Sequence, residues 1–140
     1  MKIEYTNDWF TVNASNFNKW FDSETYNWHY SHLLPMYCSK YFSKWWDTDK
    51  YNWRYCERLP VHCSEYFDIW WDPDKFHWGY GNTLAWYCTK HFDKWFDKDR
   101  YPWEGSTHAL IIRCLKYIDI WYDPDKFEMS YDEILLGSIK

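Results

Sequence analysis

The segment KWWDTDKYNW, residues 44–53, decides the fold because related copies of it recur along the chain. The copies are KWFDSETYNW at 19–28, IWWDPDKFHW at 69–78, KWFDKDRYPW at 94–103 and IWYDPDKFEM at 120–129. Their first tryptophans follow one another at steps of 25, 25, 25 and 26 residues. Repeats of roughly 20 to 50 residues bury their apolar faces by stacking on neighbouring repeats. The sequence therefore predicts a tandem-repeat architecture.

An apolar stripe with helical spacing precedes each motif. Leu34, Cys38, Phe42 and Trp45 stand at i, i+4, i+8 and i+11, which is one face of an α-helix. We therefore expect one helix of about thirteen residues in each repeat. The same stripe recurs as Leu59, Cys63, Phe67, Trp70, then Leu84, Cys88, Phe92, Trp95, and finally Leu110, Cys114, Ile118, Trp121.

The segment that follows each helix has two interpretations. Asp72-Pro73-Asp74-Lys75 can cap a short second helix, or it can form a turn that leads into a strand with alternating rings, Phe76-x-Trp78-x-Tyr80. Pro102 occupies the middle of the equivalent segment in the next repeat, where it would remove a hydrogen bond from an interior strand. We therefore favour a short helical or irregular return over a strand.

These patterns predict an all-α fold, a short right-handed-type solenoid of about five 25-residue repeats, with an α/β solenoid carrying one short strand per repeat as the alternative. We expect one domain over residues 1–140. The last step between first tryptophans is 26 residues and not 25, so one extra residue lies between Trp103 and Cys114. We expect it in a loop near Gly105, because the apolar stripe beyond it is intact. The predicted parts are a degenerate N-terminal cap at about 1–30, full repeats at about 31–55, 56–80, 81–105 and 106–131, and a truncated C-terminal cap at 132–140.

Composition restricts the classes of partner. A net charge of −5, with 16 Lys and Arg among 21 Asp and Glu, argues against nucleic acid, which needs clustered basic residues. No apolar run is long enough to cross a membrane, and residues 1–13 lack the features of a secretory signal. We therefore expect a cytoplasmic protein without a membrane or nucleic-acid partner.

Four of the five cysteines, Cys38, Cys63, Cys88 and Cys114, occupy one position of the repeat, and Cys56 stands apart. Neighbouring helices lie about 8 to 10 Å apart, too far for a disulfide, so we expect buried core thiols. Zinc is the alternative, but Cys88 with His91, and Cys56 with His62 and Cys63, lack a second ligand pair.

The repeated Asp-x-Asp is interpreted as backbone capping. A calcium site needs six to eight oxygen ligands, and the next residue in four of the repeats is a Lys or Arg. Capping of a helix start by the first aspartate requires no further ligand.

Side chains with rings or polar tips stand one residue before and three residues after each repeat cysteine. They can bridge neighbouring repeats with the ring buried and the tip in water, or they can form an exposed row of aromatic rings for an extended ligand. We call these residues the polar-tipped flank. Its members, which are the predicted binding residues, are Tyr37, Tyr41, His62, Tyr66, Tyr87, His91, Arg113 and Tyr117.

No catalytic motif is present. The chain has four glycines and no phosphate-binding loop or nucleophile elbow, so we predict no enzyme activity, no catalytic residue, no metal site and no cofactor. The first functional hypothesis is a repeat scaffold for a protein or peptide partner, with homo-oligomers possible through the repeat ends. The second is a module for an extended glycan or another ring-stacking ligand, and a metal-binding or enzymatic role is third. Burial of the polar-tipped flank would favour the first hypothesis over the second.

Overall fold

The computed structural model describes residues 4–139, with the side chains of residues 138 and 139 left out. The outermost residues of the two predicted caps, 1–3 and 140, therefore lie outside the described residues. The chain divides into two compact units, Met1–Phe76 and His77–Lys140.

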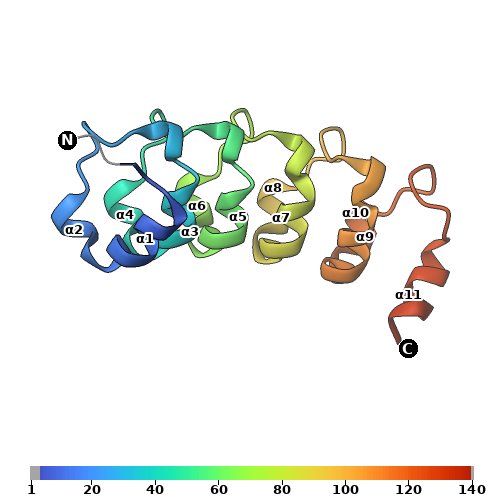
Figure 1. Ribbon diagram of the computed structural model, residues 1–140. Helices are drawn as coiled ribbons and strands as arrows, with labels where there is room; N and C mark the ends of the chain where they lie inside the picture. Colours follow the sequence, from blue (N-terminus) through green and yellow to red (C-terminus); the bar gives the residue numbers. More distant parts are fainter. Residues whose placement is uncertain (1–3, 140) are drawn as a thin grey trace. The chain divides into compact units, whose positions relative to one another are not determined.

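Every regular element in residues 4–139 is helical, and no strand occurs there (Figure 1). The predicted all-α class is confirmed, and the alternative with a strand in each repeat is not supported. No helix in the described part of the chain is both long and apolar enough to span a membrane.

The first unit repeats one pattern, in which a 3₁₀ turn is followed by a short α-helix, a second 3₁₀ turn and a one-turn helix. In order, its elements are α1 (Asn7–Asn13), η1 (Ala14–Asn16), α2 (Phe17–Trp20), η2 (Trp28–Tyr30), α3 (Leu33–Cys38), η3 (Ser39–Tyr41), α4 (Phe42–Trp45), η4 (Trp53–Tyr55), α5 (Arg58–Cys63), η5 (Ser64–Tyr66) and α6 (Phe67–Trp70).

The second unit continues this pattern and ends in a separate helix, α11. Its elements are η6 (Trp78–Tyr80), α7 (Gly81–Tyr87), η7 (Thr89–His91), α8 (Phe92–Trp95), α9 (Trp103–Arg113), η8 (Leu115–Tyr117), α10 (Ile118–Trp121) and α11 (Tyr131–Ile139).

The prediction of one continuous helix of about thirteen residues is wrong in one respect, because the helix is interrupted at the repeat cysteine. Cys38 has φ −126° and ψ 28°, and the helix resumes through η3 into α4. At the equivalent breaks in the second unit, the Cys88 and Cys114 carbonyls accept the backbone N–H groups of His91 and Tyr117 at 3.0 and 2.9 Å. A carbonyl oxygen has two lone pairs, so the Cys38 carbonyl can also accept a side-chain donor. The indole Nε1 of Trp45 donates to it at 2.7 Å.

This indole-to-carbonyl hydrogen bond recurs in both units. The first tryptophan of each motif donates to the carbonyl seven residues earlier, which in four cases belongs to the repeat cysteine. The recurring seven-residue spacing between cysteine and tryptophan therefore has two roles. It keeps both residues on the buried face, and it places the indole N–H at the carbonyl where the helix is interrupted. The pairs are Trp20–Asn13, Trp45–Cys38, Trp70–Cys63, Trp95–Cys88 and Trp121–Cys114.

The predicted core is confirmed. All members of the Leu-Cys-Phe-Trp stripes are buried, with exposed fractions of 0 to 4%. All five cysteines are buried and free of disulfides. Burial raises the pKa of the Cys38, Cys63, Cys88 and Cys114 thiols to about 12, because an apolar environment disfavours the thiolate.

The Asp-x-Asp segment forms a turn rather than the start of a second helix. Asp47 Oδ1 accepts hydrogen bonds from the backbone N–H groups of Asp49 and Lys50, at 2.9 and 3.2 Å. The Asp47 carbonyl accepts from the N–H of Tyr51 at 2.9 Å. The aspartate therefore caps backbone donors, as expected, but the 3₁₀ turn of the return begins only at Trp53.

The extra residue of the last repeat lies at a kink in α9. Glu104 has a non-helical ψ of 114°, and Gly105 has φ +82°, a conformation that strongly favours glycine. The prediction of an insertion near Gly105 is confirmed, and the remainder of α9 carries Leu110 into the core.

One contact between consecutive repeats is made by a hydrogen bond in the first unit and by close packing of a proline ring on a glycine in the second. In the first unit the buried Ser31 hydroxyl accepts the backbone N–H of Asn52 at 3.0 Å. In the second unit the equivalent residues are Gly81 and Pro102. Pro102 has no N–H to donate, and its ring occupies the space that a side chain on Gly81 would need, since an added Cβ would lie 2.6 Å from Pro102 Cδ. Cys56, the cysteine outside the regular series, stands at this same repeat position.

Candidate functional site

Four members of the polar-tipped flank stack on phenylalanines of the preceding repeat. Tyr41 lies on Phe17 with ring centroids 4.7 Å apart, and Tyr66 lies on Phe42 at 4.6 Å. The interplanar angles are 9° and 4°, so the rings are nearly parallel. The flank therefore provides inter-repeat stacking contacts at these positions. The other two pairs are Tyr37 on Phe10, and Tyr117 on Phe92.

The remaining flank residues differ from one another. His62 is half-buried, and its burial, with Arg58 nearby, lowers its pKa. His91 is also half-buried, whereas the Tyr87 side chain is 51% exposed. Arg113 is exposed, and its Nε donates to the carbonyl of Trp86 at 3.2 Å. Within each unit the flank does not present a continuous row of exposed rings.

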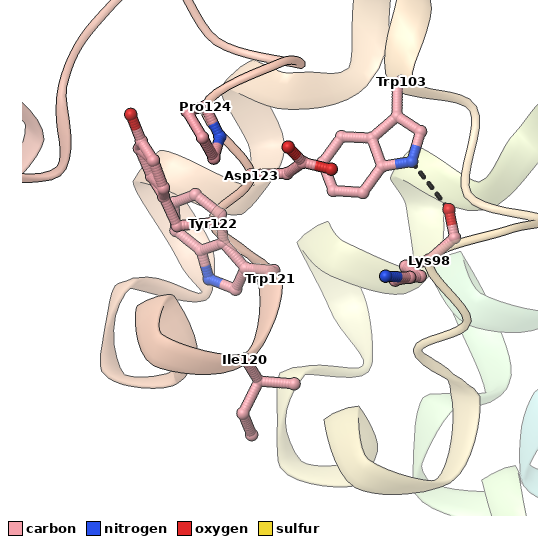
Figure 2. A pocket seen from close by; sticks show the side chains of 7 residues that line it. All are labelled: Lys98, Trp103, Ile120, Trp121, Tyr122, Asp123 and Pro124. Carbon is pink, nitrogen blue, oxygen red and sulfur yellow. Dashed lines mark hydrogen bonds between the residues drawn. The ribbon is translucent and has the colours of Figure 1, made fainter.

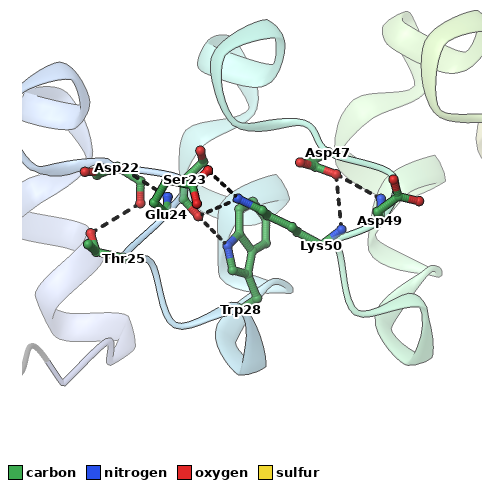
Figure 3. A network of polar contacts seen from close by, with 8 residues as sticks. All are labelled: Asp22, Ser23, Glu24, Thr25, Trp28, Asp47, Asp49 and Lys50. Atoms are coloured by element: carbon green, nitrogen blue, oxygen red, sulfur yellow. Dashed lines mark hydrogen bonds and ion pairs between the residues drawn. The ribbon is translucent and has the colours of Figure 1, made fainter.

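A polar network joins the Asp-x-Asp turns of consecutive repeats in the first unit (Figure 3). Lys50 Nζ donates to the Ser23 carbonyl at 3.2 Å and to Glu24 Oε1 at 3.1 Å. The Ser23 carbonyl also accepts from Trp28 Nε1 at 3.0 Å. Lys50 therefore makes a contact between repeats, a role that its sequence position alone did not indicate.

The same arrangement occurs one repeat later. The Thr48 carbonyl accepts from Trp53 Nε1 at 2.9 Å and from Lys75 Nζ at 3.4 Å, and Lys75 Nζ lies 3.3 Å from Asp49 Oδ1. We call Lys50, Lys75, Arg100 and Lys126 the turn cations, and Trp28, Trp53, Trp78 and Trp103 the second tryptophans.

The second unit contains a cavity beside Trp103 (Figure 2). Its volume is about 320 Å³. Trp103 forms one wall, with its indole N–H donated to the Lys98 carbonyl at 2.8 Å. Asp123 projects toward the Trp103 ring from the segment after α10 (Figure 2). The full lining is Lys98, Trp103, Ile120, Trp121, Tyr122, Asp123 and Pro124.

Two further cavities lie in the second unit. One, of about 340 Å³, also uses Trp103 and is lined in addition by Thr107, Ile111 and residues 126–129. The other, of about 470 Å³, lies against α9, η8 and α11 and is bounded only by apolar side chains and a glycine. We call it the apolar cavity. Its residues are Ile111, Ile112, Leu115, Met129, Ile134 and Gly137.

The sequence did not predict that these cavity residues form a site. Two signals were visible, the extra residue near Gly105 and the replacement of the closing tryptophan of the motif by Met129. Both occur in the second unit, which also contains the three described cavities.

A polar cluster in the first unit was also missed. The imidazole of His32 lies beside the Tyr55 ring, with centroids 4.3 Å apart and planes tilted by 36°, and its Nδ1 is buried without a hydrogen-bond partner. Burial and Arg58 lower the pKa of His32, while Glu57 acts in the opposite direction. Arg58 Nε lies 3.4 Å from Glu57 Oε1.

No group of three or more His, Cys, Asp or Glu side chains in the described part of the chain is placed to hold a metal ion. The half-sites considered for zinc therefore acquire no further ligands of these types among those residues.

Comparison of the chain with protein-family models, with curated proteins and with solved structures gave no match. The functional argument therefore rests on the sequence and the geometry.

Proposed function

We propose that this chain is a non-catalytic repeat scaffold that binds a protein or peptide partner. We further propose that its repeats stack as a right-handed-type solenoid of about five units in a cytoplasmic protein. Support for stacking comes from contacts that recur between consecutive repeats, such as Tyr41 on Phe17 and Tyr66 on Phe42. Stacked repeats present an extended face on which a peptide can lie.

The apolar cavity carries the proposal. Its rim includes Ile112, which is 50% exposed, and Met129, which is 41% exposed, and Leu136 of the adjoining α11 is 63% exposed. Exposed apolar side chains around a concave, uncharged lining are typical of surfaces that receive an apolar anchor from a protein partner. A methionine at such a surface can adapt its shape to the anchor.

The use of the polar-tipped flank supports the same choice. An extended glycan would need exposed aromatic rings in a row, but the rings of Tyr41, Tyr66 and Tyr117 are stacked on core phenylalanines. A glycan or other ring-stacking ligand is the second candidate. It is favoured by Trp103, which borders two cavities together with Asp123 and Glu128.

Selection from a random peptide library on the full chain tests the proposal. We expect selected peptides to share apolar anchors and to lose at least tenfold in affinity for the Ile112→Asp variant, which places a charge at the rim of the apolar cavity. Ile69→Asp is the matched control, because Ile69 is 59% exposed in the first unit and should leave the affinity unchanged. Equal binding to wild type and Ile112→Asp, or binding to a glycan array alone, would overturn the proposal.

Sedimentation of the same samples measures self-association through the repeat ends. A concentration-dependent dimer that Ile112→Asp abolishes would make a second copy of the chain the partner of the apolar cavity.

A further inference from the structure

We propose that the Trp103 cavity binds a lysine or arginine side chain of the partner. This inference rests on the proposed function of binding a protein or peptide, and it names the chemistry that one part of the partner must carry.

In the first unit, each second tryptophan is accompanied by a cation from the following repeat. The Ser23 carbonyl accepts both the Trp28 indole and the Lys50 ammonium. One repeat later, the Thr48 carbonyl accepts both the Trp53 indole and the Lys75 ammonium. Carboxylates of Glu24 and Asp49 complete the two cation sites. The chain therefore contains two copies of a lysine site built from a carbonyl, a carboxylate and a tryptophan.

The second unit contains a related contact. The guanidinium carbon of Arg100 lies over the Trp78 ring, 5.8 Å from its centroid. A cation over an indole ring is attracted by the negative face of the ring. The place beside a second tryptophan can therefore be occupied by an arginine of the following repeat as well as by a lysine.

At Trp103 the equivalent cation is missing. The Lys98 carbonyl accepts the Trp103 indole, as in the earlier repeats, but Lys126 Nζ makes no hydrogen bond or ion pair with any described residue. Lys126 instead borders the other Trp103 cavity, with Thr107 and Ile111. The Asp99 carboxylate, which corresponds to Glu24 and Asp49, likewise has no partner within residues 4–139.

The cavity of about 320 Å³ beside Trp103 has part of the chemistry of the filled sites. It retains Lys98, whose carbonyl accepts the Trp103 indole, and it is lined by Asp123, the equivalent of Asp47, whose Oδ1 accepts the backbone N–H of Asp125 at 2.9 Å. The Lys98 side chain is the one unfavourable element, because it also lines the cavity and carries the same charge as the proposed ligand. Residues 23 and 48, at the same place in the repeat, are Ser and Thr.

The test uses the full chain and two small probes that differ by charge. N-acetyl-lysine N-methylamide carries the ammonium, and N-acetyl-norleucine N-methylamide has a similar aliphatic side chain without it. Each is titrated while the indole N–H resonances are followed by NMR, with Trp103→Phe identifying the Trp103 signal. We expect a saturable shift of that signal with the lysine probe, an affinity about fivefold or more above that of the norleucine probe, and weakening by added salt. The Trp28 and Trp53 signals are internal controls, since lysines of this chain already occupy their sites.

Three variants should change the affinity for the lysine probe in predictable directions. Lys98→Ser should raise the affinity several-fold, whereas Asp99→Asn and Asp123→Asn should each lower it. Equal affinity for both probes, equal shifts at Trp28 and Trp53, or no shift at Trp103 in wild type and Lys98→Ser would overturn the inference.

The Ile112→Asp variant separates this inference from the proposed function. Selected peptides that need Ile112 but do not shift Trp103 would leave the scaffold proposal standing and remove the lysine site. A lysine-dependent shift of the Trp103 signal, with no selected peptide that needs Ile112, would support the lysine site and remove the scaffold proposal.

Discussion

Gly81 and Pro102 form a complementary pair, because a Cβ on Gly81 would lie 2.6 Å from Pro102 Cδ and 3.1 Å from its Cγ. The corresponding pair in the first unit, Ser31 and Asn52, is joined by a 3.0 Å hydrogen bond. Two places in the repeat array, 50 residues apart, therefore solve the same packing problem with different chemistry, and each solution needs both of its members.

Gly81→Ser should destabilise the protein by about 1–3 kcal/mol, because the added side chain meets a proline ring and finds no N–H donor. Pro102→Asn in the same chain should restore most of that loss by recreating the Ser31–Asn52 pair. Urea denaturation of the two single variants and the double variant measures the coupling. Simple additivity of the two changes would contradict this pairing.

Trp45→Phe should cost about 2–4 kcal/mol, because it leaves a cavity and removes the donor to the buried Cys38 carbonyl. Trp20→Phe is the control. Trp20 donates in the same way to Asn13 but is half-buried, so its replacement should cost less. Denaturation midpoints measure both variants, and equal losses would contradict the expectation that the greater burial of Trp45 raises the cost of its replacement.

The pKa values of His32 and His62 are lowered in the folded protein, mainly by burial and in addition by Arg58. As pH falls below about 6.5, the unfolded chain takes up protons on these residues before the folded chain does. Stability should therefore be retained above pH 6.5 and fall on acidification toward the lower folded pKa values. Melting temperatures between pH 7.5 and 5 measure the effect.

The double variant His32→Phe, His62→Tyr should reduce this acid dependence, with Tyr at 62 matching the residue type at 37 and 87. An unchanged slope in the double variant would assign the acid sensitivity to other groups.

The repeat cysteines should resist alkylation. With pKa values of about 12 and buried sulfurs, Cys38, Cys63, Cys88 and Cys114 carry very little reactive thiolate at pH 8. We expect iodoacetamide to modify them about a thousandfold more slowly in the folded protein than in urea, as followed by peptide mass spectrometry. Rapid modification of any one of the four before unfolding would contradict its place in the core.

The repeat period, the buried stripe and the absence of strands from residues 4–139 could be predicted because each depends on local spacing. The helix break at Cys38 could not, because Trp45 has the spacing of a helical core residue whether or not its indole closes a break. The roles of Lys50 and Lys75 were missed for a related reason. Their partners, Ser23 and Thr48, lie 27 residues earlier, beyond the reach of a local pattern.

The polar-tipped flank stays a prediction as a binding surface. Sequence reasoning favoured side chains that recur, so it selected Tyr41, Tyr66 and Tyr117, which stack on the core phenylalanines. Regular positions in a repeat protein are mostly required for contacts between repeats. The described cavities lie around Trp103, which closes the motif at 94–103, and around Met129, where the last motif departs from the others.

Oxidative footprinting with and without a selected peptide tests the central claim, that a partner peptide binds at the apolar cavity, most directly. Met129 is 41% exposed, and methionine reacts readily with hydroxyl radicals. The account predicts that bound peptide protects Met129 and Ile112, while the half-buried Met36 of the first unit reacts at the same rate as before. Protection of Tyr87 with Met129 and Ile112 unchanged would place the partner on the polar-tipped flank and contradict the account.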